Sequence, residues 1–149
     1  VEDFENSLAS FHGVKYCVST MNCTAALHLG MMAAGLELGD EVICPDLTFI
    51  APANMAYLTT RNLKLLDVQP DTLNIDPDLI ASHISDKTKA IICVNQFGHS
   101  CDFDEIRNLV KEKDVCVVED NAEALGGKYK NKINKHNYKM PQSHLQFAN

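Results

Sequence analysis

Apolar residues follow two periodicities along this chain, one typical of helices and one typical of buried strands. Residues 1–12 and 103–110 carry apolar side chains three or four positions apart, which predicts helices with one buried face. Short runs rich in Val, Ile and Leu predict buried strands. These runs cover residues 41–44, 63–68, 89–94 and 115–118, with a weaker candidate strand at Tyr16–Ser19.

Further helices are predicted between these runs from their end signals. A helix over 26–35 follows Asn22 and Thr24, either of which can serve as its N-cap. Another over 50–59 carries a proline in its first turn, and a third begins after Asp76. Strands therefore alternate with helices at short connections, which predicts a three-layer α/β fold with a mainly parallel, doubly wound sheet.

Polar or small residues follow each predicted strand. Right-handed crossovers place the carboxyl ends of parallel strands at one edge of a sheet, where ligands bind in open α/β folds. We therefore expect five loops to converge there, and this convergence favours a binding site over isolated structural roles. The loops contain residues 22–25, 48–49, Asp67, 95–99 and 120–123.

Each of these loops also has a purely structural interpretation. Asp120 ends the run Val-Cys-Val-Val-Glu-Asp, where a buried acid can meet a cofactor or simply cap the following turn. Residues 22–25 present backbone N–H groups and a hydroxyl that suit a phosphate, but every helix needs such a cap. Phe49 can cover a flat ligand or belong to the core.

Composition excludes several classes of protein. The formal net charge of −7 argues against a nucleic-acid partner, and no apolar run is long enough to cross a membrane. The six cysteines form no C-x-x-C pair and match no standard zinc pattern, so we expect a reduced, cytoplasmic protein without a metal site. Neither G-x-G-x-x-G nor a P-loop motif is present.

Residues 1–132 resemble the DegT/DnrJ/EryC1/StrS family of sugar-nucleotide aminotransferases. Five segments carry the resemblance through their order and spacing. They are Asn-Cys-Thr-Ala-Ala-Leu at 22–27, Gly-Asp-Glu-Val-Ile at 39–43, Pro-Asp-Leu-Thr-Phe at 45–49, Asn-Ile-Asp-Pro at 74–77 and Glu-Asp-Asn-Ala-Glu-Ala-Leu-Gly at 119–126. The last segment is most similar to perosamine-synthase-like members.

The resemblance implies a pyridoxal phosphate site on part of an aspartate-aminotransferase-like, fold type I large domain spanning residues 1–130. Asp120 would pair with the pyridine nitrogen of the cofactor and keep it protonated. Glu123 would lie near the phenolic oxygen, Thr24 and Ala25 would hold the phosphate, and Phe49 would stack on the ring. The family further implies a nucleotide-linked keto sugar, an amino donor such as glutamate, polysaccharide or deoxyamino-sugar biosynthesis, and a homodimer.

The chain departs from the family pattern at three places. Cys23 replaces a usual Gly, and Asn95-Gln96-Phe97 replaces the usual His-Leu-Tyr, which leaves the role of that loop open. The segment containing the Schiff-base lysine does not appear, so no catalytic residue is assigned, and the chain is expected to be truncated before that lysine.

Residues 131–149 form a polar, basic tail that we expect to be disordered. We therefore expect this chain alone not to transaminate. Two alternatives stay open. One is a non-catalytic fragment or interaction partner of a full-length relative. The other is the dehydratase branch of the family, where a His replaces the Lys; His136 or His144 would then be the candidate, although neither lies in matching sequence.

Overall fold

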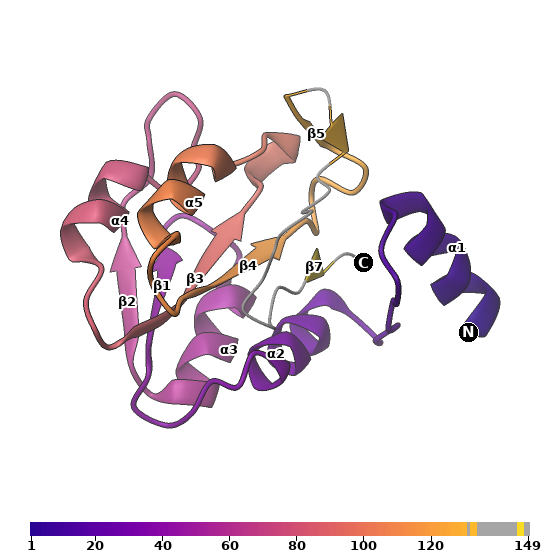
Figure 1. Cartoon of the computed structure of the whole chain (residues 1–149), viewed down its shortest axis with the longest axis horizontal. Helices are drawn as coiled ribbons and strands as arrows, with labels where there is room; N and C mark the ends of the chain where they lie inside the picture. Colours follow the sequence, from indigo (N-terminus) through magenta and orange to yellow (C-terminus); the bar gives the residue numbers. More distant parts are fainter. Residues whose placement is uncertain (131, 134–145, 148–149) are drawn as a thin grey trace.

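The computed structural model describes residues 1–130, 132–133 and 146–147, and its centre is a parallel sheet with the strand order β2-β1-β3-β4-β7 (Figure 1). All neighbouring strands of this sheet run parallel. Its strands are β1 (Glu41–Pro45), β2 (Leu63–Leu66), β3 (Thr88–Val94), β4 (Cys116–Asp120) and β7 (Gln146–Phe147). A separate antiparallel hairpin consists of β5 (Lys128–Tyr129) and β6 (Lys132–Ile133).

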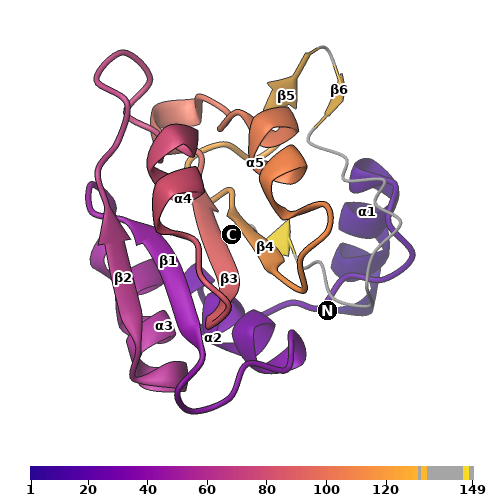
Figure 2. The same ribbon diagram turned by 60° about the vertical axis from the view of Figure 1, so that its left-hand side comes forward.

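Helices cover both faces of the sheet, which confirms the predicted three-layer, doubly wound fold. Helices α2 and α3 pack on one face, and α4 and α5 lie on the other (Figures 1 and 2). Helix α1 stands to one side, beyond β7 (Figure 1). The helices are α1 (Glu2–His12), α2 (Cys23–Ala33), α3 (Ile50–Thr60), α4 (Pro77–His83) and α5 (Phe103–Val110), with a short 3₁₀ turn, η1, at Gln96–Gly98.

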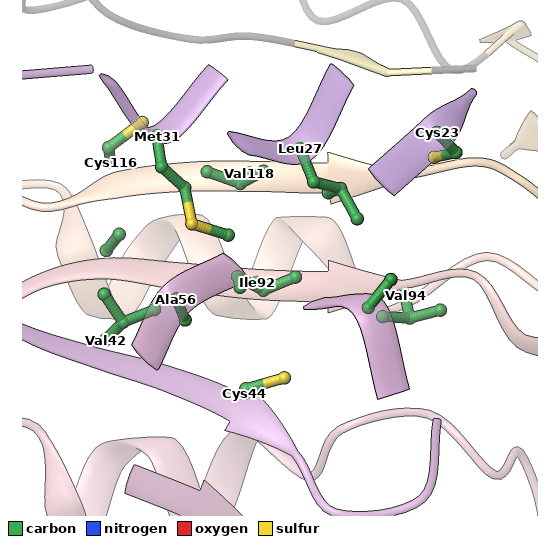
Figure 3. Packing of buried hydrophobic residues seen from close by; sticks show 12 residues of the cluster. Cys23, Leu27, Met31, Val42, Cys44, Ala56, Ile92, Val94, Cys116 and Val118 are labelled. Atoms are coloured by element: carbon green, nitrogen blue, oxygen red, sulfur yellow. The ribbon is translucent and has the colours of Figure 1, made fainter. Parts of the chain in front are cut away.

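Alternation along the strands divides the apolar core into two clusters. On β3, Ile92 faces α2 and α3, whereas Ile91 faces α4 and α5, because successive side chains of a strand point to opposite faces. Figure 3 shows the cluster between the sheet and helices α2 and α3, in which Met31, Leu27 and Cys23 of α2 lie in a row over the sheet. Cys23 ends this row at the carboxyl edge of the strands and brings the start of α2 to the predicted site.

The predicted helix ends are largely confirmed. Gly13 ends α1 with φ of 63°, a left-handed conformation that glycine adopts without strain. Asn22, rather than Thr24, caps α2, because its side chain accepts a hydrogen bond from the N–H of Ala25. Asp76 and Asp102 cap α4 and α5 in the same way. Short polar side chains therefore begin three of the helices at the positions that the sequence indicates.

The predicted strand at Tyr16–Ser19 is wrong. This segment has no regular secondary structure, and the N–H and hydroxyl of Ser19 both donate to the carboxylate of Glu5 in α1. The Ser19 N–H is thus bound to α1 rather than to a neighbouring strand.

The predicted disordered tail, 131–149, lies mostly outside the described residues; the parts described are β6 and β7. Within the described part of the chain, no helix is both long and apolar enough to span a membrane.

Candidate functional site

The candidate site lies at the carboxyl ends of β1 and β3. The strand order changes direction between these two strands, because β2 is added on one side of β1, and β3 and β4 on the other. The loop after β1 leads to α3 on one face, and the loop after β3 leads to α5 on the other. The side chain of Gln96 joins the two loops, donating from Nε2 to the carbonyl oxygen of Leu47 over 2.6 Å. Crevices at such reversals are the usual ligand sites of open α/β sheets.

Asp120 ends β4 at this edge and is only 5% exposed. One carboxylate oxygen, Oδ1, accepts the N–H of Ala122 over 2.9 Å and the thiol of Cys23 over 3.5 Å. The thiol contact joins residues 97 positions apart in the sequence and places the carboxylate against the first turn of α2. The positive end of the helix dipole and a buried acid therefore adjoin each other.

Burial raises the pKa of the Asp120 carboxyl above its ordinary value, and the charge of Glu123 raises it further. The hydrogen bonds from Ala122 and Cys23 oppose this shift. Burial, followed by the charge of Asp120, raises the pKa of the Cys23 thiol to about 12, so the thiol is protonated and acts as the donor. Among the described residues, Asp120 forms no ion pair with a cation.

A buried polar network, which the sequence did not predict, supports the edge next to Asp120. The side-chain amide of Asn95 donates to Glu119 Oε1 over 2.7 Å and to Asn121 Oδ1, while its oxygen accepts the N–H of Cys101. Asn95, Glu119 and Asn121 are all buried. The only sequence signal for this network is the placement of polar residues directly after two buried strands.

Glu123 binds the loop after β3. Its Oε2 accepts the N–H of Phe97 over 2.7 Å. Buried Asn74 holds the same loop on both sides of Phe97, accepting the N–H of Gln96 and donating to the carbonyl of His99. Glu123 therefore lies at the site edge with Oε2 engaged by the loop, while its Oε1 makes no hydrogen bond with another described residue.

The start of α2 is capped by the side chain of the residue that precedes it. The N–H of Ala25 already donates to the side chain of Asn22 over 2.9 Å, so a phosphate would replace or share this cap. Thr24 is half-buried, and its hydroxyl makes no hydrogen bond with another described residue. On the loop after β1, the hydroxyl of Thr48 is buried and makes no hydrogen bond with another described residue, and sequence reasoning gave this group no role.

Two of the predicted site residues stand outside the hydrogen-bonded group. Phe49 lies on the loop before α3 and is 73% exposed, so its ring is accessible rather than part of the core. Asp67 follows the edge strand β2 and accepts the N–H of Val68, as a turn-capping residue does. The structure thus brings Cys23, Asp120 and Glu123 to one edge and assigns Asp67 a local structural role.

Comparison with known proteins identifies the family. The model of the DegT/DnrJ/EryC1/StrS aminotransferase family matches residues 1–137. The chain belongs to this family. It is 42% identical over 132 residues to a GDP-perosamine synthase from Escherichia coli O157:H7, covering 89% of this chain and 36% of that enzyme.

Solved structures of aminotransferases share the fold. An aminotransferase from Psychrobacter cryohalolentis superposes with a TM-score of 0.86 at 36% identity, covering 89% of this chain and 34% of that one. The PLP form of a sugar aminotransferase from Streptococcus pneumoniae gives a TM-score of 0.83 at 29% identity, with 89% and 38% covered. The chain therefore spans about a third of the length of its relatives, and the match confirms the fold type I architecture.

Proposed function

We propose that this chain forms the cofactor-binding part of a pyridoxal-phosphate-dependent aminotransferase acting on a nucleotide-linked keto sugar. In this proposal the whole protein takes its amino group from a donor such as glutamate, works as a homodimer and resides in the cytoplasm. All six cysteines lie in the described part of the chain, and no disulfide joins any two of them, in keeping with a reducing compartment. Membership of the family supports the reaction class.

The observation that carries this proposal is the buried carboxylate of Asp120 at the end of β4. A buried acid without a cation among the described residues is costly, and a protonated pyridine nitrogen would supply the missing charge. The bound cofactor would in turn supply the electron sink for chemistry at an amino-bearing carbon. Asp120 would keep the proton on the ring nitrogen, and Cys23 and Ala122 would hold the carboxylate in place.

The other proposed cofactor contacts fit this arrangement. The Thr24 hydroxyl, the N–H groups at the start of α2 and the buried Thr48 hydroxyl would take the phosphate. The accessible ring of Phe49 would cover one face of the cofactor ring, and Glu123 would face its phenolic oxygen through the oxygen that Phe97 leaves available.

Titration with pyridoxal phosphate tests the proposed site directly. We expect saturable binding at one equivalent, seen as a change in cofactor absorbance, and binding of pyridoxal at least about tenfold weaker because it lacks the phosphate. Thr24→Val should reduce this preference for the phosphorylated compound. Equal affinity for the two compounds would show that the start of α2 does not hold a phosphate.

The chain by itself is expected not to transaminate, since no lysine occupies the family's Schiff-base segment. Lys130 is paired with Asp104 of α5 at 2.6 Å, and Lys128 lies on the same hairpin. Borohydride reduction with pyridoxal phosphate, followed by peptide mapping, should give scattered and substoichiometric adducts. A single stoichiometric adduct together with turnover of an amino donor would contradict this expectation.

A further inference from the structure

An open groove lies next to the loop after β3, whose backbone Glu123 binds at Phe97. Residues 97–100 of the loop after β3 form one wall, and residues 128–130 of the β5 hairpin form the other. The groove holds about 520 Å³. Its lining is mostly polar, and Gly98, whose φ is +83°, brings the loop backbone close to the carbonyl oxygen of Glu123.

Phe97 is held in an unfavourable conformation in this wall. Its φ of 51° and ψ of 28° lie in the left-handed region, which is rare for a bulky residue. The carboxylate of Glu123, which accepts the Phe97 N–H, and the side chain of Asn74, which bonds the residues on either side, hold the loop in this shape. The ring is nevertheless 75% exposed, so the strained conformation does not serve to bury it. Strain maintained in this way is typical of ligand-binding positions.

The hairpin wall supplies a positive charge. Asp104 neutralises Lys130, and the Tyr129 hydroxyl donates to Asp102 over 2.6 Å. Lys128 is exposed and forms no ion pair with another described residue. The groove therefore combines an exposed aromatic ring with an ammonium group that no described carboxylate neutralises. A nucleotide carries the matching pair of features, a flat base and an anionic phosphate.

We propose that this groove binds the nucleoside diphosphate part of the sugar nucleotide, with the base stacked on Phe97 and the phosphates next to Lys128. The link to a sugar nucleotide rests on the proposed function, whereas the groove itself rests on the contacts above. Its position against Glu123 would place the attached sugar at the edge of the cofactor site. In this proposal Phe97 and Lys128 are substrate-binding residues. Phe97, which stands where the family usually has Tyr, would then stack on the base.

Calorimetric titration of the full chain with GDP, UDP and inorganic pyrophosphate tests the groove. Phe97→Ala is expected to weaken both nucleotides about fivefold or more while leaving pyrophosphate unchanged, because pyrophosphate has no base to stack. Phe97→Leu, which keeps the apolar bulk without the aromatic face, should show the same pattern. Lys128→Gln should weaken all three ligands and make their binding less sensitive to salt. Lys111→Gln, on an exposed position after α5, is the matched control and should change nothing.

Nucleotide binding that is unaffected by both Phe97 variants and by Lys128→Gln overturns the inference, as does the absence of nucleotide binding to a folded chain. The proposed cofactor site is tested separately. Asp120→Ala should lose pyridoxal phosphate and keep GDP, since the groove does not include Asp120. If the Phe97 and Lys128 variants bind nucleotides as the wild type does, while Asp120→Ala loses pyridoxal phosphate, the groove alone is rejected. If those variants weaken nucleotide binding, while Asp120→Ala keeps pyridoxal phosphate, the cofactor site alone is rejected.

Discussion

Asp120→Ala is expected to weaken pyridoxal phosphate binding about a hundredfold or more, measured by cofactor absorbance. A buried, hydrogen-bonded carboxylate that pairs with a cation is worth far more than an exposed ion pair, and its removal leaves the pyridine nitrogen without a partner. Asp120 is 5% exposed and is oriented by Ala122 and Cys23, so little reorganisation is needed on binding. Retention of affinity in this variant would refute the role assigned to Asp120.

Asp120→Asn gives the matched control, because it keeps the shape and removes the charge. This variant should also bind the cofactor more weakly, yet it should stabilise the cofactor-free chain at pH 7 by about 1 kcal/mol in denaturant unfolding. The reason is that burial raises the Asp120 pKa, so the charged form destabilises the folded state. The gain should grow as the pH rises through that raised pKa and vanish in acid, where the wild-type carboxyl is protonated.

Cofactor affinity in the wild-type chain should fall as the pH drops through the raised pKa of Asp120, because a protonated carboxyl cannot pair with the pyridinium nitrogen. The Asn variant should lack this component of the pH dependence. A pH profile that is identical in both proteins would show that another group controls binding.

Asn95→Ala is expected to destabilise the chain by about 3 kcal/mol, measured by urea unfolding. The substitution removes three buried hydrogen bonds, to Glu119, Asn121 and the N–H of Cys101. Each of these groups then loses a partner in a place that water does not reach, and the Glu119 carboxylate is the most costly of them. The Cys101 N–H also fixes the orientation of the Asn95 side-chain amide, because this donor can bond only to the amide oxygen and not to its NH₂ group.

Two further variants sharpen this experiment. Asn108→Ala, on an exposed position of α5, should stay within about 0.5 kcal/mol of the wild type. Asn95→Asp should place a second carboxylate against Glu119, so its loss of stability should grow as the pH rises and diminish in acid. A cost below about 1 kcal/mol for Asn95→Ala would show that the network does not hold this edge together.

Much of the fold followed from local patterns in the sequence. Strand runs such as residues 89–94 and capping residues such as Asp76 act within a few positions of themselves, so their effect can be predicted without tertiary structure. The run at Tyr16–Ser19 has the composition of a strand but lies against α1, where Glu5 takes the Ser19 N–H. A strand needs a neighbouring strand, and that requirement cannot be read from one segment.

The candidate site shows the same division. The sequence by itself determined that Asp120 ends a buried strand and that a helix begins at Asn22 or Thr24, because both features are local. Only the tertiary structure decided that the Cys23 thiol meets Asp120, that Glu123 holds the backbone of Phe97, and that Asn95 joins two strand ends. These contacts depend on the register and order of the strands, which non-local packing sets, and they determine which polar residues are buried together at the edge of the sheet.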